Sequence, residues 1–333
     1  MLQNTQETFP KTSILSEKLF LGLKWAIFLG IIWMLYHTIK QKNQSFENIL
    51  LVTKNAFIPK NTLKIAVLLV FIFVNWAFEA KKWQVLAQRI EPLSFTNAFQ
   101  SVLIGLSLGF ITPANLGDYA GRIWTLKHKN KTEAIGAILM GNGIQFYVSM
   151  IFGVIAYLII GRKEITIFDQ IIFCLLIFTL FLGIFIYAKR LKLIGYLPKK
   201  SWLIPYQKYF KVLVEFDAKE ILQVFNWSIL RYLTFSLQFV ILLVMFEVNI
   251  NLIDLWAISC LVFLFKTIIP TINFISDLVV REYTALHFFG LFSVDTSSVM
   301  VATFCLWLIN ILFPVVVGAF ILLFTPKLNN LKE

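Results

Sequence analysis

Charged residues are scarce in this chain. Asp, Glu, Lys and Arg make up 14% of its 333 residues, whereas a soluble domain holds about 25%. Hydrophobic residues make up 59%, in continuous runs such as 65–78 and 311–324 that lack the alternating pattern of barrel strands. The composition therefore excludes a soluble globular protein and a membrane β-barrel. It predicts an all-α fold, in which 1–333 form the single domain of a polytopic helical membrane protein.

Cysteine and histidine are also rare, with three residues of each. The cysteines, Cys174, Cys260 and Cys305, lie within apolar runs without a short spacing, which is typical of packing residues and not of a disulfide or a zinc site. The sequence contains no P-loop. We therefore expect no metal, no cofactor and no nucleotide. The formal charge of +12 is expected to reflect membrane topology and not the binding of nucleic acid.

Apolar windows of about twenty residues predict six full crossings of the membrane. They lie at 19–39, 62–80, 134–160, 167–188, 221–246 and 297–324. Two further apolar segments, 97–112 and 255–270, are shorter. As helices they would span about 24 Å, which is less than the hydrocarbon core of about 30 Å. We predict that each of them enters the membrane, breaks, and returns to the side from which it came.

A polar motif follows each short segment, so that 97–122 and 255–282 form two matched broken-helix motifs. Both copies contain a proline that ends the helix, followed by an Asp and an Arg four residues apart: Pro113, Asp118 and Arg122 in the first, and Pro270, Asp277 and Arg281 in the second. This spacing lets the Asp and the Arg pair on one helix face. Ionisable residues inside a membrane usually mark functional sites, and matched broken segments point to the binding site of a transporter.

The candidate substrate-binding residues are Asp118, Arg122, Asp277, Arg281, Glu282, Asn142, Gln145 and Lys266, and the candidate structural breaks are Pro113, Gly117 and Pro270. Arginine suits phosphate because its donors are planar, and the carboxylates would pair with a cationic part of the headgroup or position the arginines. The alternative is that each Asp–Arg pair only neutralises itself. Glu79 and Arg231 lie near predicted membrane ends, so we expect them to extend towards the headgroup region.

Small residues recur every four positions around the first motif: Ser101, Gly105 and Gly109, and then Gly117 and Gly121. Rows of this kind let helix backbones approach closely. We therefore expect the two helices around the first break to pack together. Thr112 or Asn115 is expected to cap the helix that follows this break.

The charges of the connections predict the orientation. The 189–220 connection holds eight Lys and Arg residues against three Asp and Glu residues, so it is expected to be a cytoplasmic loop that contacts anionic lipid. The 1–18 tail and the C-terminus are then cytoplasmic as well, in a protein of the inner membrane. The 40–61 connection disagrees, because it carries four lysines but is placed outside.

Three predicted crossings separate the two motifs, so they would open on opposite sides of the membrane. This arrangement is an inverted-topology repeat, which many alternating-access carriers share. The alternative is two ordinary short loops without symmetry.

The two motifs resemble those of the lysylphosphatidylglycerol synthase transmembrane-region family, whose members are also described as flippase-like integral membrane proteins. The stretch from Thr112 to Arg122 is similar to the family's Thr-Pro…Gly-Glu…Arg signature, and the stretch from Ile269 to Glu282 to its Pro…Val-Arg-Glu signature. The resemblance covers about 15–325. It implies that the protein moves or binds a phospholipid or a polyprenyl-type lipid.

The chain departs from the family pattern at three places. Phe274, Ile275 and Ser276 stand where the family usually has glycines. Asn142 and Gln145 stand where the family often has an Arg and an Asp, and Trp307 replaces an expected Arg. These changes predict a less polar site or a different ligand.

Our leading hypothesis is a flippase or carrier, and not an enzyme, that moves a phospholipid or another amphipathic lipid across the inner membrane. The family's namesake enzymes carry a cytosolic aminoacyl-transferase domain, whose activity we do not expect from these residues. One alternative is an intramembrane transferase that uses a lipid-phosphate donor, with Asp118 or Asp277 as its carboxylate. Another is a lipid-binding membrane scaffold that acts through the 189–220 loop.

Overall fold

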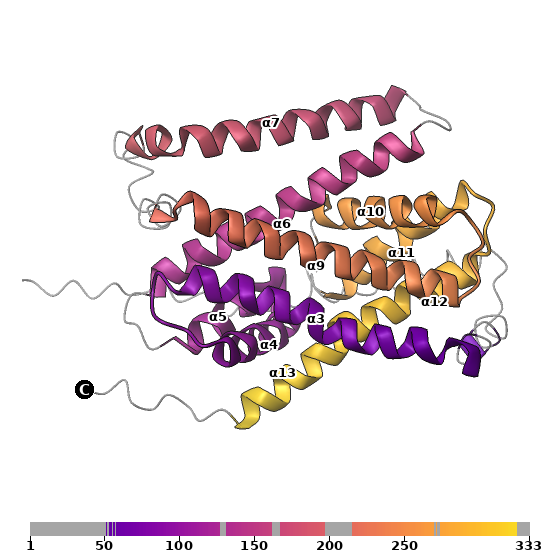
Figure 1. Cartoon of the computed structure of the whole chain (residues 1–333), viewed down its shortest axis with the longest axis horizontal. Coiled ribbons are helices and arrows are strands. Elements are labelled where there is room, and N and C mark those ends of the chain that lie inside the picture. The colour runs from indigo at the N-terminus through magenta and orange to yellow at the C-terminus, as the bar shows by residue number, and fades with distance from the viewer. Residues whose placement is uncertain are drawn as a thin grey trace, which may run out of the picture. The chain divides into compact units, whose positions relative to one another are not determined.

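A computed structural model describes residues 51, 53–54, 56, 58–126, 131–161, 167–196, 215–269, 271 and 274–324. These residues belong to one compact unit, Phe46–Glu333, whose described ranges consist of helices joined by short connections and show no strand (Figure 1). The predicted all-α fold is confirmed. The predicted crossing at 19–39, the 1–18 tail and Pro270 lie outside the described residues.

Five helical segments of the described part are long and apolar enough to cross a membrane. Four of them are single helices: α3 (Thr62–Ala87), α6 (Lys131–Ile160), α7 (Ile167–Tyr196) and α9 (Ala218–Met245). The 3-10 turn η1 (Pro59–Asn61) precedes α3. The fifth segment consists of α12 (Thr296–Trp307), the π-helical turn η5 (Leu308–Leu312) and α13 (Phe313–Phe324). Each corresponds to a predicted crossing. The protein is therefore an integral membrane protein.

Two helices extend beyond their predicted ends. α3 continues to Ala87 and not only to residue 80, which places Glu79 well inside the helix. α7 continues to Tyr196, so Lys189 and Arg190 belong to a helix and not to a loop. The predicted 189–220 loop is thus too long at this end, and it is also too long at the other, because α9 begins at Ala218.

Each of the two short apolar segments forms a helix that packs against the helix that follows it. α4 (Phe95–Ile111) is followed by the 3-10 turn η2 (Pro113–Asn115) and by α5 (Leu116–Trp124), which packs on α4. α10 (Leu252–Ile268) is followed by α11 (Phe274–Gly290), which packs on α10. We call α4–α5 the first hairpin and α10–α11 the second hairpin.

The break in the first hairpin has a local cause. Thr112 is extended, Pro113 begins η2, and Ala114 and Asn115 take left-handed conformations with φ of 51° and 56°. The backbone N–H of Gly117 donates to Thr112 Oγ1 at 2.7 Å, so Thr112 and not the Asn115 side chain caps α5. The helical path therefore changes direction between Thr112 and Leu116, next to Pro113.

Glycines allow α5 to lie directly against α4. A Cβ atom on Gly117 would overlap the carbonyl of Leu108, and one on Gly121 would overlap the backbone of Gly105. The predicted role of the small-residue rows is confirmed. A further contact was not predicted: Gly318 of α13 lies against the carbonyl of Leu103 in α4, where a Cβ would have no space.

Apart from α7, which lies between the two halves in the sequence, the described helices occur twice in the same order: a long helix, a hairpin and another long segment. The first half is α3, the first hairpin and α6, and the second half is α9, the second hairpin and the segment α12–η5–α13. α3 packs on α9, α4 packs on α13, and α10 packs on α6. Each hairpin therefore packs on the last long segment of the other half, as two related halves would do. Their opposite orientation in the membrane stays a prediction.

An exposed ion pair joins the ends of α3 and α9. Arg89 donates through Nε and Nη2 to the two carboxylate oxygens of Glu220, each at 2.7 Å, and Glu220 shares a capping box with Asp217 at the start of α9. These hydrogen bonds raise the pKa of Arg89. Exposed pairs contribute only about 0–1 kcal/mol, so Arg89 is a suitable site for a control substitution.

Candidate functional site

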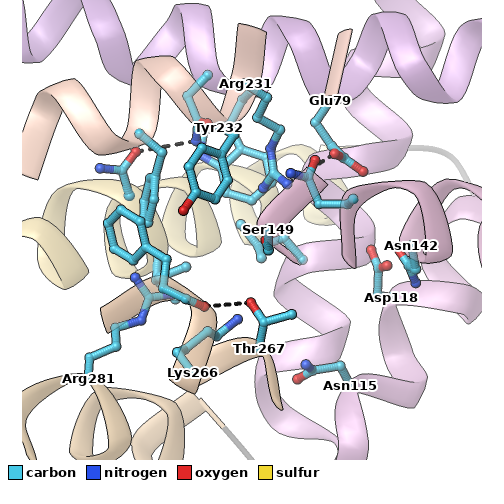
Figure 2. A pocket seen from close by; sticks show the side chains of 18 of the residues that line it. Glu79, Asn115, Asp118, Asn142, Ser149, Arg231, Tyr232, Lys266, Thr267 and Arg281 are labelled. Carbon is cyan, nitrogen blue, oxygen red and sulfur yellow. Dashed lines mark hydrogen bonds and ion pairs between the residues drawn. The ribbon is translucent and has the colours of Figure 1, made fainter. Parts of the chain in front are cut away.

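A polar cavity of about 380 Å³ lies among the helices of the two halves (Figure 2). Side chains of α3 to α6 and α9 to α11 line it, together with residues of η2 and η5. Six of the eight predicted substrate-binding residues line the cavity: Asp118, Arg122, Asn142, Gln145, Lys266 and Arg281. The other two, Asp277 and Glu282, are buried nearby on α11 and do not line it.

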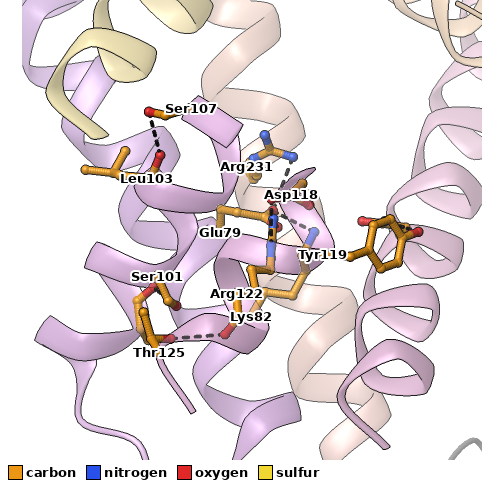
Figure 3. A network of polar contacts seen from close by, with 12 residues as sticks. Glu79, Lys82, Ser101, Leu103, Ser107, Asp118, Tyr119, Arg122, Thr125 and Arg231 are labelled. Carbon is orange, nitrogen blue, oxygen red and sulfur yellow. Dashed lines mark hydrogen bonds and ion pairs between the residues drawn. The ribbon is translucent and has the colours of Figure 1, made fainter. Parts of the chain in front are cut away.

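A buried carboxylate, Glu79, organises the end of the cavity next to the first hairpin (Figure 3). Its Oε2 lies 2.6 Å from Lys82 Nζ and 3.3 Å from Arg231 Nη1, and its Oε1 lies 3.0 Å from Arg122 Nη2. Arg122 also donates through Nε to Asp118 Oδ1 at 2.9 Å. We call these five residues the Glu79 cluster. It contains three cations and two carboxylates.

The prediction for Glu79 and Arg231 was wrong, because these residues bind each other inside the bundle and do not extend towards the headgroups. Only 2% of Glu79 and 2% of Lys82 is exposed. Lys82 was not among the candidate site residues, because position 82 was expected to lie in a connection after the 62–80 crossing, whereas it lies inside α3. A signal was present in the sequence, because Glu79 and Lys82 are three residues apart and would share a helix face in a longer α3.

A second cluster lies on the second hairpin and joins α10 to α11. Asp277 accepts a hydrogen bond from Arg281 Nε at 2.8 Å, and its other oxygen lies 3.1 Å from Lys266 Nζ. We call these three residues the Asp277 cluster. The predicted pairing of Asp and Arg four residues apart is confirmed in both motifs, and Lys266 joins the second pair.

Glu282 follows Arg281 directly but belongs to neither cluster. It is buried, and its Oε2 has no hydrogen-bond partner among the described residues. The structure therefore does not place Glu282 with the other candidates.

Amide side chains of α6 complete one wall of the cavity. Asn142 donates to the hydroxyl of Tyr119 at 3.4 Å, and Gln145 accepts a hydrogen bond from Lys82 at 3.5 Å. The prediction that Asn142 and Gln145 share a helix face is confirmed. They link α6 to the first hairpin and to α3.

Aromatic rings lie beside three of the arginines. The guanidinium of Arg231 lies 5.2 Å from the ring of Trp76, that of Arg281 lies 5.2 Å from Phe235, and that of Arg122 lies 5.8 Å from Trp83. Such contacts are attractive, and more so where water is excluded. They help to hold the charged groups in position.

The residues that the structure describes contain no group of three or more His, Cys, Asp or Glu side chains that could hold a metal ion. In this part of the chain, both carboxylates that line the cavity, Glu79 and Asp118, bind arginine. The cavity thus combines four cations with a few amides and aromatic rings. It is suited to a ligand that carries negative charge and hydrogen-bonding groups.

Residues 23–318 match the family model of the lysylphosphatidylglycerol synthase TM region. The chain belongs to this family. The match covers both hairpins and all residues that line the cavity. No curated protein matches the chain.

The structure places two of the departures from the family pattern. Asn142 and Gln145 line the cavity, so they occupy site positions without the charges expected of this family. Trp307 does not line the cavity and instead packs on Phe110 and Phe304. The charges of this member's site come instead from α3, α5, α9, α10 and α11.

Proposed function

We propose that this protein is a flippase-like carrier that moves a phospholipid or another amphipathic lipid across the inner membrane. The observation that carries the proposal is the charged cavity of about 380 Å³ between two broken hairpins, inside a bundle of apolar helices. A cavity of this kind can hold a headgroup that the hydrocarbon core would exclude. The acyl chains would remain in the lipid phase, next to the apolar outer faces of the helices.

The matched order of the two halves supports alternating access. In the proposed cycle, one hairpin opens the cavity to the cytoplasm and the other opens it to the outside. The termini are cytoplasmic in this proposal, and a gradient or the concentration difference of the lipid drives the movement. No enzymatic step is needed, and Asp118 and Asp277 serve to position Arg122 and Arg281.

Replacing both Arg122 and Arg281 with Gln should reduce translocation by at least about tenfold. Each substitution removes a charged donor near the headgroup, and one charge-assisted hydrogen bond contributes about 1.5–3 kcal/mol, or about tenfold or more. The measurement is the rate at which a fluorescent phospholipid in proteoliposomes becomes accessible to an impermeant quencher. Empty liposomes set the background rate.

Two comparisons make this result interpretable. Arg89→Gln also removes one positive charge, but from the exposed pair with Glu220, and should leave the rate unchanged. The double replacement of Arg122 and Arg281 with Lys keeps the cavity charge while removing the planar donors, and should give an intermediate rate. Wild-type rates in a folded Arg122→Gln, Arg281→Gln protein would rule out the proposed role of the cavity.

Single cysteines at Tyr119 and Leu278 should react with impermeant thiol reagents from opposite sides of the membrane. The reason is that the inverted repeat predicts that the two hairpins open in opposite directions. The experiment needs a background in which Cys174, Cys260 and Cys305 are replaced. Labelling of both positions from the same side would contradict the inverted repeat, and with it alternating access by the two hairpins.

A further inference from the structure

Positive charge exceeds negative charge around the cavity. The charged groups that line it are Arg122, Arg231, Lys266 and Arg281 on the positive side, and Glu79 and Asp118 on the negative side. Just behind them, Lys82 binds Glu79 and Asp277 binds Arg281, and these two opposite charges cancel. With each group in its usual charged form, an excess of two positive charges remains. An ionised Glu282, which does not line the cavity, would still leave the balance positive.

Several buried N–H groups of the lining residues have no partner in the described part of the chain. They are Arg231 Nε, Arg281 Nη1, Trp76 Nε1 and Asn310 Nδ2. Arg281 is only 4% exposed, Trp76 is 5% exposed and Asn310 is 0% exposed. Buried donors are rarely left unsatisfied, so each of them is available to an acceptor that comes close to it. They come from α9, α11, α3 and η5, and therefore from both halves.

The unpartnered acceptors of the lining are fewer. Two amide oxygens, Asn75 Oδ1 and Asn115 Oδ1, are buried without a partner among the described residues. Glu79 Oε2 has no hydrogen-bond partner by strict geometry, but it lies within ion-pair distance of Lys82 and Arg231. The residues around the cavity thus hold four spare donors, two of them on positively charged guanidiniums, and two neutral acceptors suited to a hydroxyl group. Both carboxylates of the lining, Glu79 and Asp118, already bind arginine, so an ammonium group would have to compete with a guanidinium for them.

We propose that this cavity selects an anionic phosphate headgroup, one in which no amino group balances the phosphate, and that it disfavours cationic headgroups. The proposal rests on the lipid-carrier function and names its substrate class. A phosphate would bring negative charge and acceptor oxygens to Arg231 and Arg281, whose guanidiniums lie against Trp76 and Phe235. A headgroup with an additional ammonium would add positive charge to a site that already has too much of it.

The first experiment measures binding to the purified full-length protein in mixed micelles. The probes are phosphatidic acid, phosphatidylglycerol, phosphatidylcholine and lysylphosphatidylglycerol with identical acyl chains, each used to compete with a fluorescent phosphatidylglycerol. We expect phosphatidic acid and phosphatidylglycerol to bind at least about tenfold more tightly than the other two. Equal binding of all four lipids, or tighter binding of lysylphosphatidylglycerol, would overturn the proposal.

Variants connect this preference to the cavity. Arg281→Gln should reduce the preference for the anionic lipids by about tenfold, because it removes a charge and a spare donor. Lys266→Gln should reduce it too, and it is safer for folding because 34% of the Lys266 side chain is exposed. Arg89→Gln serves as the matched control and should keep the wild-type preference. A preference that persists in folded Arg281→Gln and Lys266→Gln proteins would place the selectivity elsewhere and overturn the proposal.

Inorganic phosphate distinguishes a lipid headgroup from a free anion. Millimolar phosphate should displace little of the fluorescent lipid if the headgroup is the ligand, because the acyl chains add to lipid binding. Full displacement by phosphate, with no difference among the four lipids, would mean that the site binds free anions, against the proposal. Translocation of the same lipids tests the carrier function separately. Equal transport of all four lipids would overturn only the selectivity, whereas anion-selective binding without transport would overturn only the carrier function.

Discussion

Replacing Glu79 with Gln is expected to destabilise the protein more than any other conservative change in the cavity. The substitution keeps the shape of the side chain but removes one negative charge, which leaves Lys82, Arg122 and Arg231 with Asp118 as the only carboxylate of the cluster. Breaking a buried ion pair costs about 3–5 kcal/mol, because the remaining charge stays buried without compensation. Here one carboxylate serves three cations, so we expect a loss at the upper end of this range.

Thermal unfolding in detergent measures this loss, with the yield of monodisperse protein as a second readout. Glu247→Gln, at an exposed position in the loop after α9, controls for the change in total charge and should unfold like the wild type. If excess buried positive charge is the cause, adding Lys82→Met to Glu79→Gln should restore part of the stability. An unfolding temperature of Glu79→Gln equal to that of the control would show that Glu79 does not hold the cluster together.

The Glu79 cluster also shows what the sequence could and could not predict. The i,i+4 spacing alone predicts the pairing of Asp118 with Arg122, because both residues lie on one short helix. A hydropathy window instead ends a crossing where charges begin, so it ended the predicted 62–80 crossing at residue 80. Because α3 continues to Ala87, Glu79 and Lys82 lie inside the bundle and not at its edge. Glu79 and Lys82, the charged residues near which the predicted crossing ended, are therefore part of the Glu79 cluster.

Contacts between distant segments were predictable only in part. Pro113 and the glycine rows predict a break and a close return, since both effects are local. The approach of Gly318 to the carbonyl of Leu103 and the hydrogen bond from Ser107 Oγ to the carbonyl of Val315, at 2.5 Å, join residues more than 200 positions apart. No spacing within one helix encodes which long segment a hairpin packs on. The two matched motifs of the sequence predicted two broken helical segments but not these contacts.

Replacing Gly117 with Ala is expected to open the first hairpin and to abolish translocation. The added Cβ would overlap the carbonyl of Leu108 and lie 2.7 Å from the backbone N of Gly109, and backbone atoms cannot rotate away as a side chain can. Overpacking of this kind typically costs about 1–3 kcal/mol, and more where nothing can move. Since Asp118 follows Gly117 directly, any shift of α5 also moves Asp118 and Arg122 away from Glu79. One methyl group should thus affect both stability and the charged site.

Gly143→Ala is the matched control, because Gly143 lies inside α6 and a Cβ there would meet no atom within 4 Å. This variant should be as stable as the wild type or slightly more stable, since alanine favours a helix by about 1 kcal/mol over glycine. The unfolding temperature and the lipid translocation rate of both variants provide the measurement. Gly117→Ala should lose both, and Gly143→Ala should keep both. If the two variants behave alike, the close contact between α4 and α5 does not position the cavity.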